Sequence, residues 1–353
     1  MFGCADSIVE GPRVYGRTTY KIFKSFPMMG HIAFGVIERG SNVIQVRPST
    51  LCFHDCIFCS VDAGPSSRRR ASEYIVSDVE WLAEWAGSVA EAKGGDVEAL
   101  IDGVGEPLTN PKILDLIRLL KSKKGIRRVA IETHGGSLSV ELGKRLYEAG
   151  LDRINLSIDA LDSNLARRLA GVQWYDVDRI IKVVKELMEE TNLDVILTPV
   201  IVPGYNEGEL AKIARLAKEL GLGVRSGWPT GVLAQKYEEH KYGRRPPQVR
   251  PWTWREFYNY LKKVELEIGY RLTPSAEEVG FTRRPRVERP FKVGETVNLL
   301  VVANGWLKGE VLGVDPDCYR VFSIVGARIS LGARLKARVI KNDNNIYIAK
   351  PFD

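Results

Sequence analysis

Three cysteines lie close together in the first sixth of the chain, at Cys52, Cys56 and Cys59. Their spacing is C-x3-C-x2-C, and they follow an apolar stretch, residues 43–47, that is typical of a strand. Three clustered thiolates can bind iron, and a cubane iron–sulfur cluster normally takes four protein ligands. A site with three ligands leaves one metal position open, and open positions generally serve chemistry. The triplet therefore indicates a metal centre with a reactive position.

Two plainer interpretations of the triplet have to be weighed. A structural zinc site would need a fourth ligand, and His54, inside the loop, is the nearby candidate. Its place within the loop makes a shared metal awkward to reach, but spacing alone leaves this alternative open. A disulfide framework does not suit a chain with five cysteines in 353 residues and no N-terminal pattern of a secretory signal.

The cysteine spacing resembles that of the radical S-adenosylmethionine (radical SAM) superfamily. Phe58, the aromatic residue before the third cysteine, fits that family's pattern. In the family, the open iron chelates the methionine part of SAM, and the reduced cluster cleaves SAM to a 5′-deoxyadenosyl radical. The resemblance implies a [4Fe-4S] cluster on the three cysteines, SAM as the second cofactor with Phe58 beside it, and an external electron donor.

Short apolar runs alternate with amphipathic helical patterns between residues 43 and 280. This order predicts an α/β fold with a parallel sheet and right-handed crossovers. Six units are too few for the closed eight-unit barrel, so we expect a partial (β/α)6 barrel, which the family resemblance also implies. Functional groups of such a fold gather at the C-terminal ends of the strands. The predicted strands are 43–47, 97–102, 127–133, 153–158, 194–200 and 222–226, and the predicted helices start near 77, 111, 139, 174, 206 and 253.

The predicted second strand is followed by Gly103-Val104-Gly105-Glu106-Pro107. This run resembles the GGEP element of radical SAM enzymes, which binds the amino group of the SAM methionine. Valine stands where the usual pair has its first glycine, a change that backbone contacts would tolerate. The resemblance implies that Gly103, Gly105, Glu106 and Pro107 bind the cofactor, and the alternative is an ordinary glycine-rich turn.

The predicted third strand ends in Thr133-His134. Related enzymes often carry a polar Thr-Asn-Gly-like end here, which lines the cofactor site, and His134 takes the place of the asparagine. This resemblance implies that Thr133 and His134 bind the cofactor. His134 can both donate and accept hydrogen bonds, so it is a candidate contact for the SAM carboxylate or ribose and a candidate catalytic proton donor. The alternative is a surface histidine in a turn.

Polar and apolar side chains also mark the ends of the fourth and fifth strands. Alternation along residues 153–158 places Ser157 and Asp159 on one face, and the resemblance implies contact with the ribose. Val200 and Val202 resemble the family's apolar adenine-binding stretch. Asn206 suits the N-cap of the following helix.

The chain is basic, with a net charge of +7 and a pI near 9.0, and the excess is uneven. Residues 281–353 contain 13 Lys and Arg against 7 Asp and Glu. Residues 1–42 form an N-terminal extension with a hairpin, and residues 281–290 a charged, proline-punctuated linker between the 43–280 domain and the last segment. Residues 291–353 predict five short strands of a small barrel of the oligonucleotide-binding (OB) type. This segment resembles the TRAM domain, a module of RNA-modifying enzymes.

Basic and aromatic residues predict contact with a polyanion, and nucleic acid is the first choice. Cations interleave with rings between residues 236 and 255, a pattern that can stack bases and track phosphate. A solvated loop with packed tryptophans is the alternative. The candidate RNA-binding residues are Arg68, Arg69, Arg70, Arg244, Arg245, Trp252, Lys308, Arg334 and Lys336.

Cys4 and Cys318 remain outside the triplet. Methylthiotransferases of the superfamily need three further N-terminal cysteines for a second cluster, which this chain lacks. Radical RNA methyltransferases use two extra cysteines, a count that Cys4 and Cys318 match without an evident motif, and either may simply pack. No apolar run approaches the roughly 20 residues that span a bilayer, so we expect a cytoplasmic protein without membrane association.

These observations favour a radical SAM enzyme that modifies a base in RNA, most plausibly tRNA, by methylation or a related C–H functionalisation. One alternative is a radical SAM enzyme that acts on a small molecule or peptide, with the C-terminal barrel as an accessory module. The other is a zinc-stabilised RNA-binding protein without enzymatic activity.

Overall fold

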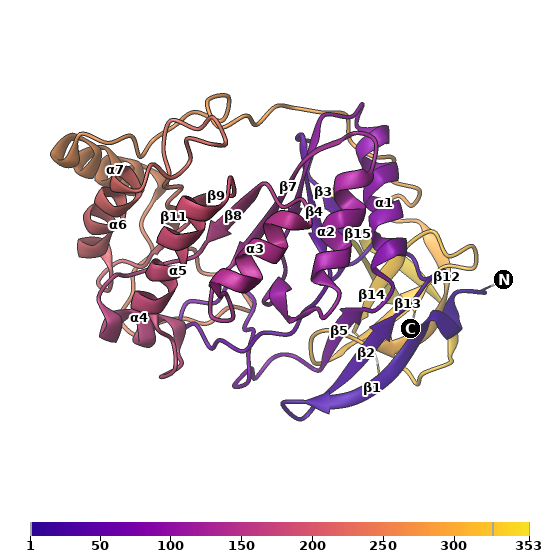
Figure 1. Ribbon diagram of the computed structural model, residues 1–353. Helices are drawn as coiled ribbons and strands as arrows, with labels where there is room; N and C mark the ends of the chain where they lie inside the picture. Colours follow the sequence, from indigo (N-terminus) through magenta and orange to yellow (C-terminus); the bar gives the residue numbers. More distant parts are fainter. Residues whose placement is uncertain (1, 327, 353) are drawn as a thin grey trace. The chain divides into compact units, whose positions relative to one another are not determined.

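The computed structural model describes residues 2–326 and 328–352, so positions 1, 327 and 353 of the predicted terminal ranges lie outside the described residues. Figure 1 shows the helices and strands of the chain, coloured along the sequence. The chain divides into two compact units. Unit 1 is discontinuous in sequence and consists of residues 1–51, 66–128 and 283–353. Unit 2 consists of residues 52–65 and 129–282. The strand β7 (Ile126–Thr133) runs from the end of one unit into the other.

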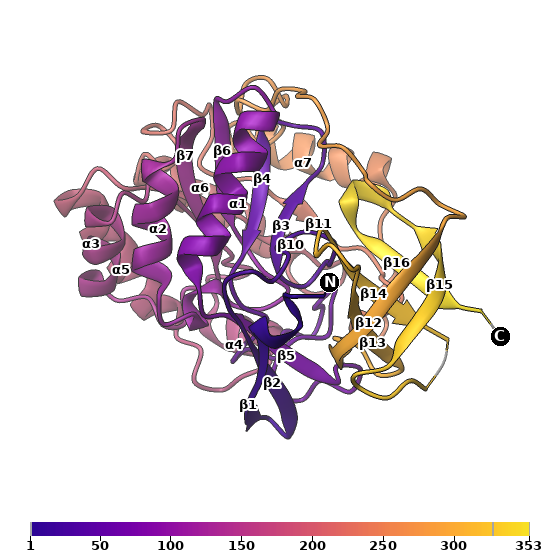
Figure 2. The ribbon, with the colours of Figure 1, turned by 90° about the vertical axis from the view of Figure 1, so that its right-hand side faces the viewer.

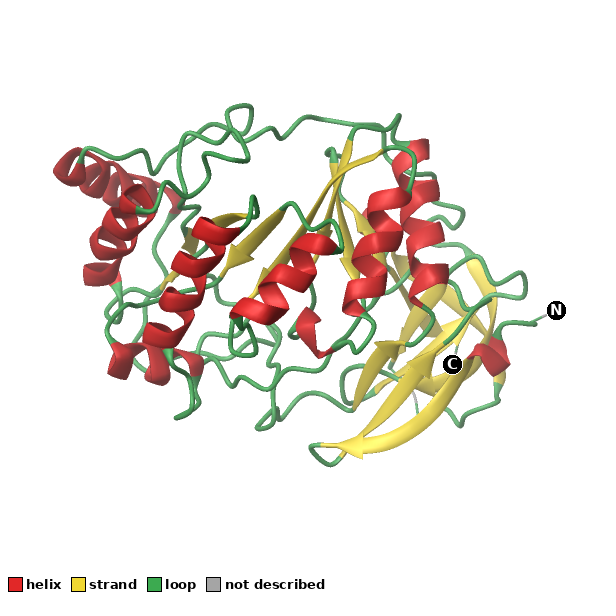
Figure 3. Ribbon diagram, viewed as in Figure 1, coloured by secondary structure: helices red, strands yellow, loops and turns green. Residues whose placement is uncertain are grey.

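Unit 1 contains an α/β part with the first of the predicted strands. β4 (Val43–Arg47) pairs in parallel with β6 (Val97–Ile101), and β3 (Gly35–Glu38) pairs with β4 in antiparallel orientation, at the predicted hairpin. Helices α1 (Val79–Ala92) and α2 (Ile113–Ser122) lie side by side (Figure 3). α1 begins after the N-cap Asp78, whose side chain accepts a hydrogen bond from Trp81 N.

Unit 1 also contains a three-stranded sheet that the sequence pattern does not predict. Its strands, in the order β1-β2-β5, are β1 (Ile8–Val14), β2 (Arg17–Ile22) and β5 (Ser72–Val76). β5 buries a carboxylate: Glu73 accepts hydrogen bonds from Arg17 Nε at 2.9 Å, Arg70 NH1 at 3.0 Å and Thr50 Oγ1 at 2.5 Å. A buried ionic group in place of an apolar one breaks the period-2 pattern that predicts a strand.

The C-terminal part of unit 1 is a closed barrel of five strands (Figure 2). The strand order is β12-β13-β14-β16-β15, and β15 pairs back onto β12. Leu299, Phe322 and Tyr347 are fully buried in its core. The expectation of an α/β fold with a small all-β barrel is confirmed at this level. The strands are β12 (Thr296–Asn304), β13 (Glu310–Val314), β14 (Val321–Val325), β15 (Arg334–Lys341) and β16 (Tyr347–Pro351).

The barrel packs directly against the N-terminal half of unit 1. Tyr74 Oη donates a hydrogen bond to Asn304 O at 2.6 Å, and Val321 N donates to Met29 O at 3.0 Å. A Cβ added at Gly30, where φ is +122°, would lie 2.2 Å from Val321 O, so only glycine permits this approach. The barrel and the N-terminal segments therefore form one packed unit, in which residues 285–290 are irregular.

A disulfide joins the N-terminal segment to the barrel within unit 1. Cys4 and Cys318 are bonded across a sequence separation of 314 residues. Phe2 N also donates a hydrogen bond to Pro316 O at 2.8 Å beside this bridge. The sequence pattern leaves the role of both cysteines open and does not predict that they pair. In this bonded form neither residue has a thiol to contribute to chemistry.

Unit 2 carries the later α/β elements. β7, β8 (Arg153–Leu156) and β9 (Asp194–Leu197) are parallel neighbours, in the order that right-handed crossovers predict. α7 begins with a capping box, in which Thr253 and Glu256 bond reciprocally to each other's backbone. The helices are α3 (Val140–Glu148), α4 (Ser163–Ala170), α5 (Val177–Glu190), α6 (Glu207–Glu219) and α7 (Trp254–Ile268).

The predicted sixth strand is wrong. Residues 222–226 form turns, and Val224 is 68% exposed. Asp194 holds this loop because its carboxylate accepts hydrogen bonds from Gly223 N at 3.0 Å and Ser226 N at 2.7 Å. The last parallel pairing lies about ten residues later, where β11 (Gln235–Lys236) pairs with β10 (Val200–Ile201).

Membrane insertion finds no support in the helices. Within residues 2–326 and 328–352, none of them combines the length and the hydropathy that a bilayer crossing requires.

Breaking the Cys4–Cys318 bridge should destabilise the protein. Because the bridge restricts the unfolded chain, Cys4→Ser or Cys318→Ser should each lower the free energy of unfolding of the apo-protein by about 2–4 kcal/mol. Denaturant titration followed by circular dichroism measures this change. The double variant should lose no more than either single variant, since both remove the same bond. Equal stability of variant and wild type without reductant would contradict the bridge, and with excess dithiothreitol the difference should disappear.

Candidate functional site

The predicted cluster cysteines lie in one irregular loop of unit 2. Cys52 and Cys56 are buried and Cys59 is partly exposed, and none of the three is in a disulfide. Cys59 N donates a hydrogen bond to Cys56 O at 3.1 Å, and Cys59 Sγ accepts one from Ala63 N at 3.2 Å. Gly64 closes the loop with φ +98°, and a Cβ there would lie 1.8 Å from His54 O. The loop therefore returns on itself and turns its thiols inward.

The helix α4, which the sequence analysis missed, supports this loop. Two loop amides donate to the last carbonyls of α4: Asp55 N to Ala170 O and Ile57 N to Leu169 O, both at 3.0 Å. Gly171 ends the helix with φ +69°, and a Cβ there would lie 2.0 Å from Asp55 O. Helix C-terminal carbonyls lack partners within the helix, so the cysteine loop satisfies them.

Arg244 fastens the cysteine loop from the other side. Its guanidinium donates to Asp62 Oδ1 at 2.8 Å, to Asp55 Oδ1 at 2.9 Å and to the carbonyls of Cys56 and Ala63 at 3.1 and 2.5 Å. Its backbone N–H donates to the Cys59 carbonyl at 2.8 Å. The expectation that Arg244 contacts RNA needs correction, because these bonds commit the guanidinium to the cysteine loop.

The three thiols of the loop disfavour one another's ionisation. Burial raises the pKa of the Cys56 thiol well above its ordinary value, and the nearby thiolates of Cys52 and Cys59 raise it further. Arg244 opposes this rise but does not cancel it. Three ionised thiols together in a buried loop need a cation among them, and a metal cluster supplies one. The donor set thus fits a three-cysteine iron–sulfur cluster.

Two histidine rings lie beside the thiols. His134 Nε2 is 3.4 Å from Cys56 Sγ, and the ring of His54 lies 4.9 Å from that of His134. Desolvation lowers the pKa of His134 to about 4 and that of His54 to about 2, so both are neutral at pH 7. Trp174 and Tyr175 pack against His54 at 5.1 and 5.7 Å between ring centroids.

Polar side chains follow the C-terminal ends of β8 and β9 in unit 2. Ser157 Oγ lies 3.3 Å from Thr198 Oγ1, and Asp159 Oδ1 accepts a hydrogen bond from Val200 N at 2.8 Å. Burial raises the pKa of Asp159 to about 7. Asp159 also adds to the electrostatic rise in the pKa of Cys56, so this carboxyl lies near the cysteine loop.

Other predicted cofactor residues of unit 2 have structural roles that the sequence did not reveal. Thr133 Oγ1 accepts a hydrogen bond from Gly135 N at 3.0 Å and Val202 is fully buried. Asn206 is the N-cap residue of α6, as predicted, but its side chain makes no capping hydrogen bond. Its carboxamide accepts from Val202 N and donates to Asp159 O, both at 2.8 Å, and so ties the end of β10 to the segment that follows β8.

The predicted methionine-binding run follows β6 in unit 1. A Cβ at Gly105 would lie 2.3 Å from Thr50 O, and Glu106 N donates to Leu51 O at 2.7 Å. The run therefore packs against the residues that directly precede Cys52 in the chain. Glu106 is 1% exposed, and its Oε1 accepts a hydrogen bond from Leu108 N at 3.2 Å in the short 3-10 helix that begins at Pro107. Asp102, just before this run, forms a buried ion pair with Arg47 at 3.0 Å that the sequence analysis missed.

The predicted RNA-binding residues separate into buried and exposed groups. Arg70 must be corrected: it is 1% exposed, pairs with Glu73 at 3.0 Å and lies over the Trp306 ring at 4.9 Å, so it cannot reach RNA. Trp252 is half-buried and packs on Tyr260. The exposed residues are Arg68, Arg69, Arg245, Lys308, Arg334 and Lys336, of which Arg245 lies 3.5 Å from Glu239.

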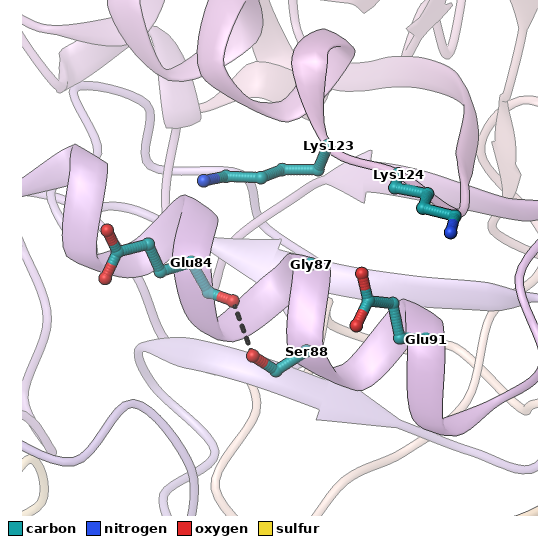
Figure 4. A pocket seen from close by; sticks show the side chains of 6 residues that line it. All are labelled: Glu84, Gly87, Ser88, Glu91, Lys123 and Lys124. Atoms are coloured by element: carbon teal, nitrogen blue, oxygen red, sulfur yellow. Dashed lines mark hydrogen bonds between the residues drawn. The ribbon is translucent and has the colours of Figure 1, made fainter.

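A polar hollow of about 330 Å³ on unit 1 is a separate feature (Figure 4). The hollow is lined by Glu84, Gly87, Ser88 and Glu91 of α1 and by Lys123 and Lys124. Negative carboxylates and positive ammonium groups therefore both face it. In Figure 4 the Ser88 hydroxyl is bonded to the Glu84 carbonyl of its own helix. None of the cysteines or predicted cofactor residues lines it, so this hollow is not the candidate site.

Comparison with known proteins identifies the centre. The model of the radical SAM superfamily matches residues 46–217, a range that contains the cysteine loop and β5 to β10. The chain belongs to the radical SAM superfamily. Members of this superfamily hold a [4Fe-4S] cluster and use SAM, and the matched range contains the three cysteines that the sequence predicts as cluster ligands. This membership answers the zinc alternative, because the radical SAM centre is an iron–sulfur centre that needs an electron donor.

The individual relatives do not identify a substrate for this chain. An uncharacterized protein of Methanocaldococcus jannaschii is 36% identical over 357 residues, covering 96% of this chain and 82% of that protein. GTP 3′,8-cyclase of Alkaliphilus metalliredigens is 26% identical over 201 residues, covering 54% of this chain and 60% of the cyclase. Among solved structures, the FeFe-hydrogenase maturase HydG of Carboxydothermus hydrogenoformans gives a TM-score of 0.50 at 17% identity, covering 67% of this chain and 56% of HydG. That likeness concerns the fold alone.

The hydrogen bonds of Arg244 to the cysteine loop predict that Arg244→Met lowers both stability and iron binding. Removal of the guanidinium leaves Asp55 and Asp62 without their cation, so we expect a loss of about 3 kcal/mol in the free energy of unfolding and less iron bound after anaerobic reconstitution. Chemical denaturation and iron analysis per chain measure both. Arg245→Met is the matched control, since this neighbouring guanidinium is 63% exposed and should be replaceable without loss. Equal iron content in the two variants would argue against a role of Arg244 in holding the cysteine loop.

Proposed function

We propose that this chain is a radical SAM enzyme that uses the 5′-deoxyadenosyl radical to modify a nucleotide base in RNA. The cluster on Cys52, Cys56 and Cys59 supplies the reductive cleavage of SAM when it is bound. The observation that carries the RNA proposal is a row of unpaired cations on the closed barrel of unit 1.

This row, the β15 stripe, consists of Arg334, Lys336 and Arg338 with Lys350 of the neighbouring strand. The first three alternate along β15 and are exposed, and Lys350 is the partner of Arg338 across the β15–β16 pairing. Figure 2 shows β12, β15 and β16 as the orange to yellow strands of one sheet. Among the described residues, none of these four cations has a carboxylate at ion-pair distance.

The neighbouring groups on this face are neutral. Across the β12–β15 pairing, Asn298 lies opposite Lys336 and Thr296 opposite Arg338, and both are exposed. A protein that gains only stability from surface cations usually intersperses both signs of charge. Four cations beside neutral hydrogen-bonding groups instead form a surface that attracts a phosphate backbone.

Aromatic rings accompany the cations at both ends of the stripe. Arg334 lies over the Phe2 ring at 5.4 Å and Arg338 over the Phe352 ring at 5.2 Å. Phe352 is 45% exposed. Proteins bind single-stranded nucleic acid by combining cations for phosphate with rings on which unpaired bases stack. This combination favours single-stranded RNA segments such as loops, whose bases are accessible to modification.

The cysteine inventory constrains the kind of radical chemistry. Three of the five cysteines form the cluster loop and the other two form the Cys4–Cys318 disulfide. The chain therefore offers one three-cysteine cluster, and no further thiol as a methyl carrier while the bridge is intact. We propose a direct radical reaction at the substrate base rather than transfer through a cysteine.

Neutralising the β15 stripe should weaken RNA binding and its salt dependence. The triple variant Lys336→Gln/Arg338→Gln/Lys350→Gln loses three phosphate contacts. The slope of log K against log salt is roughly −0.7 per phosphate contact on a single strand. We therefore expect the slope measured with a tRNA or a single-stranded RNA to become less negative by about 2. Filter binding or fluorescence anisotropy across salt concentrations measures the slope.

The matched control removes the same charge elsewhere. Lys182, Lys185 and Lys262 are exposed lysines of helices α5 and α7, and replacing all three with glutamine lowers the net charge equally. If both triple variants lose affinity alike, binding reflects net charge and the β15 stripe is not the interface. Point substitutions are preferable to deletion of residues 285–353, because deletion would uncover the groups of unit 1 on which the barrel packs.

The reaction itself has a direct test. Anaerobically reconstituted protein should release 5′-deoxyadenosine from SAM on reduction with dithionite, and Cys56→Ala should abolish this release because the cluster loses a ligand. Liquid chromatography with mass spectrometry measures the product. Continued release from Cys56→Ala would contradict the ligand assignment.

A second candidate function is radical chemistry on a small purine nucleotide. The observation in its favour is the 26% identity to a protein named GTP 3′,8-cyclase, which covers 54% of this chain. Mass spectrometry separates the candidates: a modified nucleoside in digested RNA supports the first, and a new product from free GTP with unchanged RNA supports the second.

A further inference from the structure

We propose that His134 is a positioning residue that donates a hydrogen bond to the thiolate of Cys56 and thereby raises the reduction potential of the cluster. The inference rests on the cluster of the radical SAM centre and not on the RNA substrate. It starts from the contact of 3.4 Å between His134 Nε2 and Cys56 Sγ.

The direction of this hydrogen bond follows from the chemistry of the two groups. A cysteine that ligates iron is a thiolate and can only accept a hydrogen bond. A neutral imidazole carries one N–H, so the ring nitrogen that faces the thiolate must be the protonated one. The bond is then N–H···S, with Nε2 of His134 as the donor.

The surroundings hold the His134 ring in this position. Tyr175 Oη donates to the His134 carbonyl at 3.1 Å, and Tyr175 is 3% exposed. The His54 ring lies 4.9 Å from the His134 ring at an angle of 32°, and Trp174 packs on His54 from another side. A ring fixed by packing and by its backbone keeps the donor directed at one sulfur, as a functional donor requires.

The hydrogen bond acts on electron transfer through charge. One-electron reduction adds negative charge to the cluster and its thiolates, and an N–H donor to a ligand sulfur stabilises the reduced form more than the oxidised form. Hydrogen bonds to cluster sulfurs are among the factors that set the potential of iron–sulfur centres. His134 therefore makes the cluster easier to reduce by the external donor on which the superfamily depends.

His54 is the competing donor. It is 1% exposed, and neither of its ring nitrogens has a hydrogen-bond partner among the described residues. An unsatisfied buried donor is unfavourable, so the His54 ring has reason to turn an N–H toward a group bound in the loop. The test must therefore separate the two histidines.

Redox titration of three variants tests the donor. His134→Leu removes the N–H at similar volume, His134→Gln keeps an N–H donor, and His240→Leu changes an exposed histidine as the control. Without SAM, His134→Leu should show about a tenfold lower ratio of reduced to oxidised cluster at a fixed potential, a shift of about 59 mV for a one-electron couple. His134→Gln should lie close to the wild type, and His240→Leu should match it.

Iron content decides the meaning of a failed variant. If His134→Leu binds no cluster while His134→Gln binds a full cluster with the wild-type potential, the donor is still required and the proposal stands. If both variants bind full clusters with the wild-type potential, or if both fail to bind iron, the contact only fills space and the proposal is overturned.

Pulsed electron paramagnetic resonance identifies the donor directly. In protein labelled with 15N-histidine, the reduced cluster should show a weak 15N coupling that His134→Gln abolishes and His54→Phe retains. A coupling that disappears in His54→Phe and persists in His134→Gln would assign the bond to His54 and refute the proposal.

Discussion

Three thiolates must coexist in one buried loop, and the architecture of unit 2 follows from this constraint. Burial and mutual repulsion raise the pKa of Cys56, so the loop cannot hold three charges without compensation. The protein therefore surrounds the loop with groups that fix its backbone: the end of α4, the guanidinium of Arg244 and the glycines that permit the tight return. The carboxylates of Asp55 and Asp62 form ion pairs with Arg244 and so retain this guanidinium, whose charge also favours thiolates.

Local patterns predicted much of this fold and of its site. The strands β4 and β6 to β9 begin within one residue of their expected positions. The three cysteines lie within eight residues of one another in the sequence, at Cys52, Cys56 and Cys59. Contacts between distant residues could not be predicted. Arg244 is 182 residues from Asp62, and nothing in its neighbourhood distinguishes it from the exposed Arg245. Arg70 is likewise indistinguishable from Arg68 and Arg69 until the fold buries it against Glu73.

Buried polar side chains explain why the hydrophobic pattern missed or misassigned several segments. β5 carries Glu73 where a strand pattern expects an apolar residue. The turn after α6 contains apolar residues but is held by the carboxylate of Asp194, so its sequence resembles a strand. Asn206 occupies a helix N-cap position, yet its side chain bonds to the strand end instead. Asp194 and Asn206 satisfy backbone groups that regular structure would otherwise satisfy, whereas Glu73 is satisfied by the side chains of Arg17, Thr50 and Arg70.

The discontinuity of unit 1 has a consequence for how the protein is made. This unit combines residues 1–51 with 66–128 and 283–353, while residues 129–282 belong to unit 2. A ribosome releases the N-terminal segments long before the barrel strands on which they pack, so unit 1 cannot complete its core until those strands have been synthesised. Tyr74, for example, is synthesised 230 residues before its partner Asn304. The nascent chain should therefore depend on chaperones, whereas a free-standing C-terminal domain would impose no such delay.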